Sequence, residues 1–545
     1  MNNRNVDIAK DYHQATKLSY INLSNKPPLY KSYPGLPEVP LPTEFPRPEV
    51  ATLEALAVEA VTEDSVSRAV STRAVSTGKP LDLVQVAQML YFSAGLLHRR
   101  VLPVAGEVHY RAAASAGALY PVEAYLVAGD VEGLAPGVYH FSPSDFNLKQ
   151  LRAGDYRNNL AEAAAGDSDI ASSPATLVFT AIFWRSAWKY RVRSYRYCLW
   201  DLGTILANFL ATVRGEAGLP TSLVTGFVDR QVNDLLGLDA QREGSLCLVP
   251  VGVGQKGTGG AASSSTLGLI AAGIEPQADE ISYPEIIQAH AGSSLITQEE
   301  AREWKEAAAQ PLPHIRNAAQ GQSGQALRPT SQGLASDALG ATITQRGSTR
   351  RFARANITGA QFSAILDSST RQVPADFLSP YQASLLEVYT IVNAVDGLSS
   401  GSYYFSPVQR RLELLQEGEF RQEAGHLCFE QALGADCSAV LYFLADLGRI
   451  TEHLGNRGYR AAQLEAGIMV GNAYLSAHSL GLGATGTTFY DDDVTEFFSP
   501  HAAGKSMMFL VALGRIDDNN RVRPFRSRVG VLLDSLARGA GQTPR

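Results

Sequence analysis

The 545-residue chain is poor in cysteine, in charged residues and in long apolar runs. Its four cysteines show no paired zinc-binding spacing, and their scarcity is typical of a reducing compartment. No run of 18 apolar residues is present, and the N-terminus lacks the apolar core of a signal peptide. A net charge of −7 argues against a nucleic-acid-binding surface. These absences predict a cytoplasmic protein with no metal site, no membrane span and no nucleic-acid partner.

Composition divides the chain into five segments. Residues 1–45 are polar and proline-rich, which predicts an extended arm lying over a core. Mixed helix and strand patterns fill residues 46–254 and again residues 336–520. Residues 255–335 are rich in small and polar residues and predict a linker, with a short helix that opens at a capping box over 297–300. Residues 521–545 are a C-terminal tail.

Hydrophobic periodicity predicts the elements of the first half. A helix is expected over 83–92, with Asp82 as its N-cap, and a long helix over 194–215. The predicted strands cover residues 123–128, 138–141, 177–183 and 246–251. The third of these strands is almost entirely apolar, so both of its faces should be buried.

An internal repeat is the most informative pattern in the sequence. Residues 123–125 return as 387–389, and residues 137–143 return as 401–407. Tyr195, Arg196, Gly203 and Asn208 also return 264 positions later, and segment 226–229 returns 262 positions later. We therefore predict two copies of one domain, copy 1 in residues 46–254 and copy 2 in residues 336–520. Two such copies should pack as a pseudo-twofold dimer within one chain.

Copy 2 has cationic side chains that copy 1 lacks. It opens with Arg346, Ser348 and Arg350, whose guanidinium forks and hydroxyl suit phosphate oxygens. Its last strand is followed by Arg515, where copy 1 has Val253. The matching opening of copy 1, residues 71–73, retains a single arginine. The alternative for the paired arginines is a solvated basic turn before a helix.

Copy 1 has a small-residue stretch instead, which runs over residues 112–118 and is followed by Leu119, Tyr120 and Pro121. Such a stretch lets the backbone approach a flat ligand closely, because few side chains stand in the way. Copy 2 is 12 residues shorter between its first helix and its first strand, so we expect it to have lost the counterpart of residues 114–118, with residues 381–386 leading straight into the strand. The alternative is a tight loop entering a strand.

A further difference follows the central strand. Copy 1 has Lys189 and Tyr190 there, where copy 2 has His453 and Leu454. Burial lowers the pKa of a lysine, and a nearby ammonium lowers that of a tyrosine, so either side chain could act as a general base. The alternative is a surface lysine beside a half-buried tyrosine.

Together these motifs resemble the flavin-dependent nitroreductase superfamily, and more narrowly its SagB-type dehydrogenases, which include azoline oxidases of cyanobactin and microcin-like peptide pathways. In copy 1 and its arm the resemblance rests on residues 12–17, 30–34, 115–121, 188–190, 195–197, 226–229 and 235–239. In copy 2 it rests on residues 346–350, 481–484 and 487–491. The implied fold is α+β: two tandem nitroreductase-like domains, each a mixed, mainly antiparallel sheet flanked by helices, forming an intramolecular pseudo-dimer.

The resemblance also implies FMN bound between the two copies. Copy 2 would bind the phosphate through Arg346, Ser348, Arg350 and Arg515, and would place Thr487 and Thr488 near the flavin ring. Copy 1 would line the ring with Ser115, Ala116 and Gly117. Because the motifs are divided in this way, one composite site is intact and the other has lost its ligands. We expect one FMN per chain.

The implied function is dehydrogenation of an azoline (thiazoline or oxazoline) or a similar heterocycle in natural-product biosynthesis. A proton leaves the ring carbon near Lys189 and Tyr190, a hydride passes to flavin N5, and oxygen reoxidises the flavin. The alternatives are an NAD(P)H-dependent nitro- or quinone reductase of the same fold and a flavin-free peptide-binding protein. Residues 1–60 are too short and proline-rich for a winged-helix leader-recognition domain. A modified-peptide substrate would then need a partner protein, whereas a small heterocycle would not, and further oligomerisation is open.

Overall fold

The computed structural model describes residues 2–17, 26–57, 80–102, 106–257, 280–312, 333–380, 382, 384–406 and 411–517. Residues 71–73 of copy 1, most of the Gly- and Ser-rich linker and the tail over 521–545 lie outside the described residues. Among the helices that the structure does describe, none has the length and apolar character needed to cross a bilayer.

Each copy contains one six-stranded sheet, and all described strand pairs of both sheets are antiparallel. In the order β1-β6-β5-β4-β7-β8, the sheet of copy 1 consists of Glu38–Pro40, which the N-terminal arm contributes, and of Asn147–Ala153, Gly137–Ser142, Val122–Ala128, Ala175–Ile182 and Glu243–Val251. In the order β11-β10-β9-β12-β14-β13, those of copy 2 are Arg411–Glu417, Gly401–Ser406, Glu387–Val392, Ala439–Ala445, Ser506–Gly514 and Gly483–Gly486. Five strands correspond in order, so the predicted tandem α+β fold is confirmed.

The predicted elements of copy 1 are present with small shifts at their ends. The first predicted helix is α4 (Leu83–Ala94), and Asp82 and Gln85 form a capping box at its start. The apolar strand β7 is buried along its whole length, as its composition predicts. The long helix is α8 (Ser194–Leu210), which continues as a π-helical turn over Ala211–Glu216.

Other helices flank the two sheets. They are α2 (Thr52–Leu56), α5 (Arg157–Ala163), α6 (Ser168–Ser172), α7 (Phe183–Tyr190), α9 (Asp229–Leu236), α12 (Leu339–Gln345), α13 (Gly359–Ser369), α14 (Arg421–Leu427), α15 (Ala432–Asp436) and α17 (Asp491–Phe497). Helix α7 carries the candidate catalytic pair at its C-terminal end.

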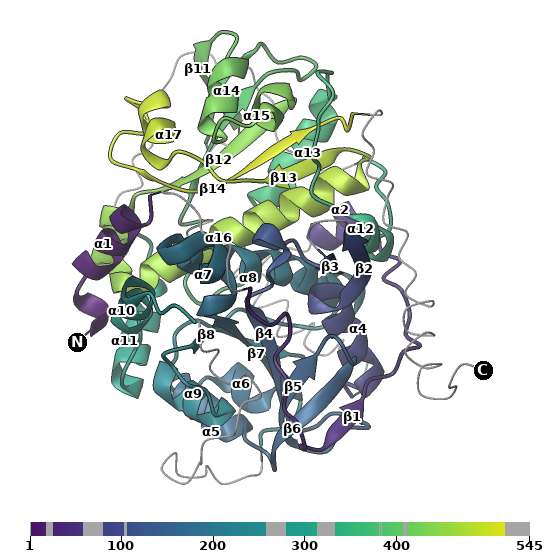
Figure 1. The fold of residues 1–545 in the computed structure, drawn as a ribbon. Helices are drawn as coiled ribbons and strands as arrows, with labels where there is room; N and C mark the ends of the chain where they lie inside the picture. Colours follow the sequence, from purple (N-terminus) through teal and green to yellow (C-terminus); the bar gives the residue numbers. More distant parts are fainter. Residues whose placement is uncertain are drawn as a thin grey trace.

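Two long helices, α8 and α16 (Leu447–Ser479), lie between the two sheets (Figure 1). They cross where Gly203 meets Gly467, two residues that the repeat makes equivalent. A Cβ on Gly203 would lie 2.5 Å from the backbone of Gly467, so only glycine permits this approach. Beside the crossing, the Trp200 indole N–H donates to Gln463 at 2.6 Å. Contact between equivalent residues marks the pseudo-twofold axis.

The arm and the linker contain more helix than their composition predicts. Helix α1 (Asp7–Ala15) lies in the arm and buries Ala9, Tyr12 and His13. The linker contains α10 (Pro284–Gly292) as well as α11 (Gln298–Ala308), the helix predicted from the cap at 297–300. These short helices are stabilised by tertiary packing more than by their own propensity, which is why composition alone missed two of them.

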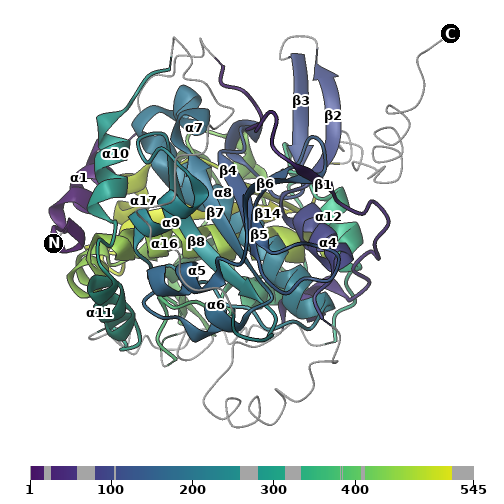
Figure 2. The same cartoon turned by 90° about the horizontal axis from the view of Figure 1, so that it is seen from below.

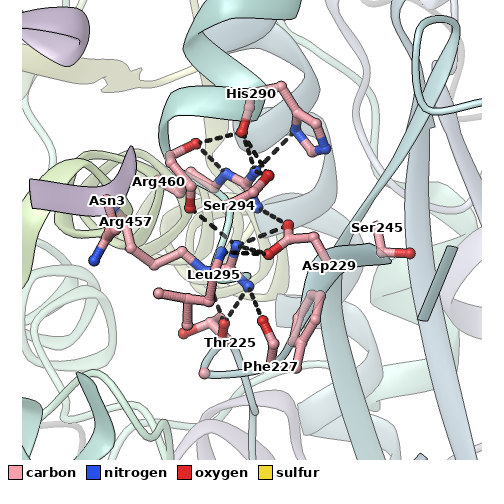
Figure 3. A network of polar contacts seen from close by, with 12 residues as sticks. Asn3, Thr225, Phe227, Asp229, Ser245, His290, Ser294, Leu295, Arg457 and Arg460 are labelled. Atoms are coloured by element: carbon pink, nitrogen blue, oxygen red, sulfur yellow. Dashed lines mark hydrogen bonds and ion pairs between the residues drawn. The ribbon is translucent and has the colours of Figure 1, made fainter. Parts of the chain in front are cut away.

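A buried ion network ties α16 to the start of α9 in copy 1 (Figure 3). Arg457 and Arg460 donate to the Asp229 carboxylate at 2.7 and 2.9 Å, and Arg460 also donates to the backbone oxygen of His290 on α10. All three charged side chains are buried. Removing one member of such a network leaves a buried charge uncompensated, at a cost of about 3–5 kcal/mol.

The equivalent network lies on the other side of the pseudo-twofold axis. Arg193 and Arg196 at the start of α8 donate to the carboxylate of Asp491, the first residue of α17. Arg196 also donates to the backbone oxygen of His13 on α1. Helices α1 and α10 therefore occupy equivalent places, so the repeated unit includes its own N-terminal arm.

One element belongs to copy 1 alone. The hairpin of β2 (Leu96–Leu102) and β3 (Gly106–Arg111) projects from the body of the molecule (Figure 2). Between α13 and β9, the described residues of copy 2 contain no strand. The 12-residue difference between the copies therefore includes this hairpin, as well as residues of the small-residue stretch.

Candidate active site

The small-residue stretch of copy 1 is fixed to helix α8 by its polar groups. The Asp201 carboxylate accepts hydrogen bonds from Ser115 Oγ at 2.5 Å and from the Ala116 N–H at 3.0 Å. One turn later, Thr204 Oγ1 donates to Ala114 O at 2.7 Å. The Ser115 hydroxyl also accepts from the backbone N–H of Tyr120 at 2.9 Å, so this side chain shapes the loop.

Gly117 brings the stretch into contact with the candidate catalytic pair. Its φ of 64° lies in the left-handed region, which favours glycine. A Cβ at this position would lie 2.9 Å from Tyr190 Oη and 3.2 Å from Lys189 Nζ. The Tyr190 ring is stacked on Tyr197, with 4.2 Å between centroids. Two motifs separated by some seventy residues in the sequence thus lie against each other.

The first arginine of copy 2 reaches across to copy 1. Arg346 follows α12, is buried, and donates from Nη2 to Ala112 O at 2.9 Å. Ser348 Oγ shares a hydrogen bond with Tyr474 Oη at 3.0 Å, and Tyr474 Oη accepts from the Gly486 N–H at 2.8 Å. The arginine motif is therefore linked both to the small-residue stretch and to β13.

Arg350 of copy 2 interacts electrostatically with the candidate catalytic pair of copy 1. Its charge acts on both Lys189 and Tyr190, although the repeat places it in the other copy. The side chain is exposed and has no hydrogen bond or ion pair with another described residue. We call this juxtaposition site A: residues 112–117, Lys189 and Tyr190 from copy 1, and residues 346–350 from copy 2.

The other predicted cofactor residues lie along the copy 2 side of site A. Thr487 and Thr488 follow β13 directly, and Thr487 Oγ1 accepts a hydrogen bond from Gln431 at 2.7 Å. Arg515 follows β14 and is exposed, and its backbone oxygen accepts from Ala353 N at 2.8 Å, close after the arginine motif. No hydrogen bond or ion pair among the described residues connects the Arg515 side chain to the other candidates, so its role stays a prediction.

Burial sets the charge states in site A. It lowers the pKa of Lys189, and the charge of Arg350 lowers it further. Burial raises the pKa of Tyr190 well above its usual value, assisted by Tyr197 and Asp201. Both shifts favour the uncharged forms, the amine of Lys189 and the phenol of Tyr190. Burial also raises the pKa of Asp201 to about 7, although its two hydrogen-bond donors oppose the shift.

Buried polar atoms in site A fit an anionic cofactor. No carboxylate of a described residue pairs with Arg346 or Arg350, and burial lowers the pKa of Arg346. Arg346 Nε and Thr488 Oγ1 are buried and have no hydrogen-bond partner among the described residues. Buried donors and cations need compensation, and a phosphate or a flavin oxygen would supply it. The residues present therefore fit FMN.

The equivalent place on the other side of the axis, which we call site B, is filled by helix α11. Trp304 is 2% exposed and donates its indole N–H to the backbone oxygen of Leu454, the equivalent of Tyr190. A Cβ on Gly226, the equivalent of Thr488, would lie 2.9 Å from the Trp304 ring. His453, the equivalent of Lys189, hydrogen-bonds Ala307 O at 2.8 Å.

Site B retains the carboxylate that holds the loop. Glu465, the equivalent of Asp201, accepts from the Leu385 N–H at 2.9 Å and from the side chain of Ser384. Ser384 Oγ accepts from Leu386 N, as Ser115 accepts from Tyr120. The serine of the small-residue stretch is thus present in copy 2, which corrects the expectation that it was lost. The deleted residues lie after it and in the hairpin.

Sequence reasoning missed the roles of Asp201 and Tyr474 and the packing position of helix α11. Asp201 stands in an otherwise apolar stretch of α8. A carboxylate buried in such a stretch needs a hydrogen-bond partner, and this need could have identified the residue from the sequence. Tyr474 replaces Leu210 at the equivalent position, so a comparison of the copies along the helix would have found it. For α11, the sequence predicts the helix and gives no indication of where it packs.

Comparison with known proteins agrees with this architecture. The nitroreductase family model matches residues 64–253 and 343–515. The crystal structure of a predicted nitroreductase from Anabaena variabilis superposes with a TM-score of 0.70 and 25% identity, covering 94% of this chain and 99% of that one. The fold and the paired domains define an oxidoreductase class, and the chain belongs to the nitroreductase family, with one family domain in each copy.

Two curated relatives are similar in sequence to part of this chain. A predicted nitroreductase of Methanocaldococcus jannaschii is 30% identical over 175 residues, which are 32% of this chain and 81% of that protein. The microcin B17-processing protein McbC of Escherichia coli is 31% identical over 130 residues, 23% of this chain and 47% of that protein. Similarity to a microcin-processing protein agrees with the resemblance to the SagB-type branch.

Proposed function

We propose that the protein is an FMN-dependent dehydrogenase of the SagB type that oxidises an azoline, or a similar heterocycle, in natural-product biosynthesis. The observation that carries the proposal is the meeting of Gly117, Lys189 and Tyr190 of copy 1 with Arg346 and Arg350 of copy 2. Two arginines without carboxylate partners among the described residues, the buried Arg346 and the exposed Arg350, suit a phosphate, and a loop without bulky side chains suits a flat ring.

The binding roles follow from the contacts. Arg346, Ser348 and Arg350 would hold the cofactor phosphate, with Arg515 as a further cation. Residues 115–117 would pack against the ring, and Thr487 and Thr488 would offer hydroxyls from copy 2. When bound, FMN supplies the hydride acceptor, and oxygen regenerates it.

Proton transfer would fall to α7. The pKa of Lys189 is lowered, so its neutral amine is the better base for the proton on the ring carbon. The raised pKa of Tyr190 keeps its phenol protonated, so it would donate a hydrogen bond to a heteroatom of the heterocycle. Gly117 leaves room for both groups at the ring face.

Flavin stoichiometry and turnover test the proposal together. Purified protein should be yellow, with one flavin per chain, and should consume oxygen while converting a thiazoline-containing peptide to its thiazole. The measurements are flavin absorbance against protein concentration, and mass spectrometry for the loss of two hydrogens. Steady NAD(P)H consumption with a nitroaromatic and no thiazole would instead identify a nitro- or quinone reductase. A colourless protein that gains no colour with added FMN would favour a peptide-binding protein.

A further inference from the structure

A cavity of about 340 Å³ lies between α7 and α10, two helices that are neighbours in both views of the fold (Figure 1, Figure 2). Phe183, Trp184 and Ala187 line it from α7, and Tyr283 lines it from the start of α10. The Phe183 ring also packs on that of His290, with 5.1 Å between centroids, so the two helices are in direct contact beside the cavity. The volume is that of a small-molecule site, and none of the lining residues belongs to site A.

An ion pair borders the cavity. Arg242 donates to the Glu280 carboxylate, from Nη2 at 2.5 Å and from Nε at 3.3 Å. The backbone oxygen of Arg242 accepts from the Phe183 N–H at 3.0 Å, so this residue also fixes the start of α7. The remaining charged residue of the lining, Asp239, is exposed to solvent. Because Arg242 and Glu280 neutralise each other, the cavity suits an uncharged ligand.

The lining also contains a hydrogen-bond donor without an acceptor. Trp184 is 6% exposed, and its buried indole N–H has no hydrogen-bond partner among the described residues. Buried indole N–H groups usually have a partner. The two other buried tryptophans follow this rule, since Trp200 donates at 2.6 Å and Trp304 at 2.9 Å. A ligand with an acceptor would satisfy Trp184 in the same way.

Copy 2 lacks this lining at the equivalent positions. Leu447 and Gly448 replace the two aromatic residues of α7, and Gly504 replaces the arginine of the ion pair. Copy 2 nevertheless forms the equivalent helix and strand, as the start of α16 and as β14. The repeated fold therefore does not require the aromatic and charged lining. Like Lys189, the lining is found in copy 1 alone.

We propose that this cavity is a second small-molecule site, which binds an uncharged aromatic compound that carries a hydrogen-bond acceptor. The aromatic part packs against Phe183, Trp184 and Tyr283, and the acceptor takes the hydrogen bond of the Trp184 indole. The inference is independent of the proposed function, because it uses no residue assigned to FMN or to proton transfer.

Coumarin is a suitable probe, because it is a flat, uncharged ring system with a lactone carbonyl. Isothermal titration calorimetry of the protein with excess FMN should show one coumarin bound per chain. Trp184→Phe should raise its dissociation constant about tenfold, because this change keeps an aromatic ring and removes the donor. Trp304→Phe, the same change outside the cavity, should leave the constant within twofold. Coumarin-3-carboxylate should bind at least about tenfold more weakly than coumarin, since the cavity does not compensate its charge.

A second variant tests the mouth of the cavity without touching its buried lining. Ile281 is 48% exposed there, so Ile281→Glu should leave the fold intact and raise the dissociation constant of coumarin about tenfold. Val253→Glu is the matched control, because Val253 is 51% exposed and lies outside the lining.

Three results would overturn the site. The first is equal coumarin affinity in the wild type and in either Trp184→Phe or Ile281→Glu. The second is the absence of measurable binding at millimolar coumarin. The third is competition between coumarin and FMN, which would place the bound ring in site A instead.

Discussion

Site A and site B are built from equivalent segments of one repeated domain. Among the segments that the structure describes, the linker helix α11 fills site B, and no equivalent helix fills site A. In site B the ring of Trp304 fills the space between Leu454 and Gly226. In site A, Thr488 stands at the position of Gly226, and its Oγ1 and Arg346 Nε are buried without a hydrogen-bond partner among the described residues. An apolar space left by a lost ligand costs stability unless something fills it. The loss of cofactor-binding residues from site B and the packing of α11 into that site are therefore parts of one change.

What the two copies share is equally informative. The carboxylates of Asp201 and Glu465 hold equivalent loops, and each copy has two arginines on a buried aspartate of the other. These shared groups fix the copies to each other. The proposed chemistry depends instead on positions where the copies differ, such as Lys189 in copy 1 and His453 in copy 2. Comparing the copies therefore separates the residues that hold the fold together from those proposed to take part in the reaction.

The largest difference between the two sites is expected for substitution of Lys189 on α7 and of its counterpart His453. Lys189→Ala should lower kcat about 10³-fold while the protein stays yellow, because a positioned base contributes rate rather than cofactor affinity. Tyr190→Phe should lower kcat less, about 10²-fold. His453→Ala, the matched change in site B, should leave kcat within twofold. Stopped-flow flavin reduction checks this contrast, and normal reduction in Lys189→Ala would remove lysine from the mechanism.

Removal of the Trp304 side chain from site B tests the comparison of the two sites through the stability of the protein. Trp304→Ala should lower the free energy of unfolding by about 3 kcal/mol, because a buried ring and its hydrogen bond are lost. The flavin content should remain one per chain, since the cavity gains no cation. Denaturant titration and flavin absorbance measure the two effects. A second bound flavin in this variant would contradict the assignment of site B.

Arg350→Ala should weaken FMN binding about 30-fold, equivalent to about 2 kcal/mol for a charge-assisted contact. Arg351→Ala is the control, because this neighbouring arginine is also exposed. Quenching of flavin fluorescence during titration of the apoprotein gives both dissociation constants. Equal constants for the two variants would place the phosphate elsewhere.

The smallest expected effect concerns pH and tests the shared carboxylates. Burial raises the pKa of both Asp201 and Glu465 to about 7, so the folded protein takes up protons that the unfolded chain releases above about pH 4. Stability should therefore fall as pH rises from about 4 to 7. Asp201→Asn and Glu465→Gln should each flatten that slope, by up to about 1.4 kcal/mol per pH unit.

The same two variants should differ in turnover. Asp201→Asn should also lower kcat/KM several-fold, because it loosens the loop that carries Gly117, whereas Glu465→Gln should not. Unfolding curves across this pH range and steady-state rates give the two readouts. A loss of activity in both variants would show that the carboxylates act only through overall stability.

The repeat predicts much of the fold, because equal offsets in strands and helices require equal folds. It also predicts which segments belong to the site: residues 115–117, Lys189 and Arg346 are brought together as the resemblance implies. The position of α11 could not be predicted. Its apolar stripe of Ala301, Trp304 and Ala308 indicates a buried face, but the surface that receives that face exists only in the folded pseudo-dimer. Tertiary packing supplied that information.

The crossing of α8 and α16 at Gly203 and Gly467 has a consequence for how ligand affinity responds to dilution of the protein. In a two-chain dimer a shared site disappears when the subunits separate, so its ligand affinity depends on protein concentration. Here both halves belong to one polypeptide, and their association is intramolecular at any concentration. Flavin affinity should therefore be the same at nanomolar and micromolar protein.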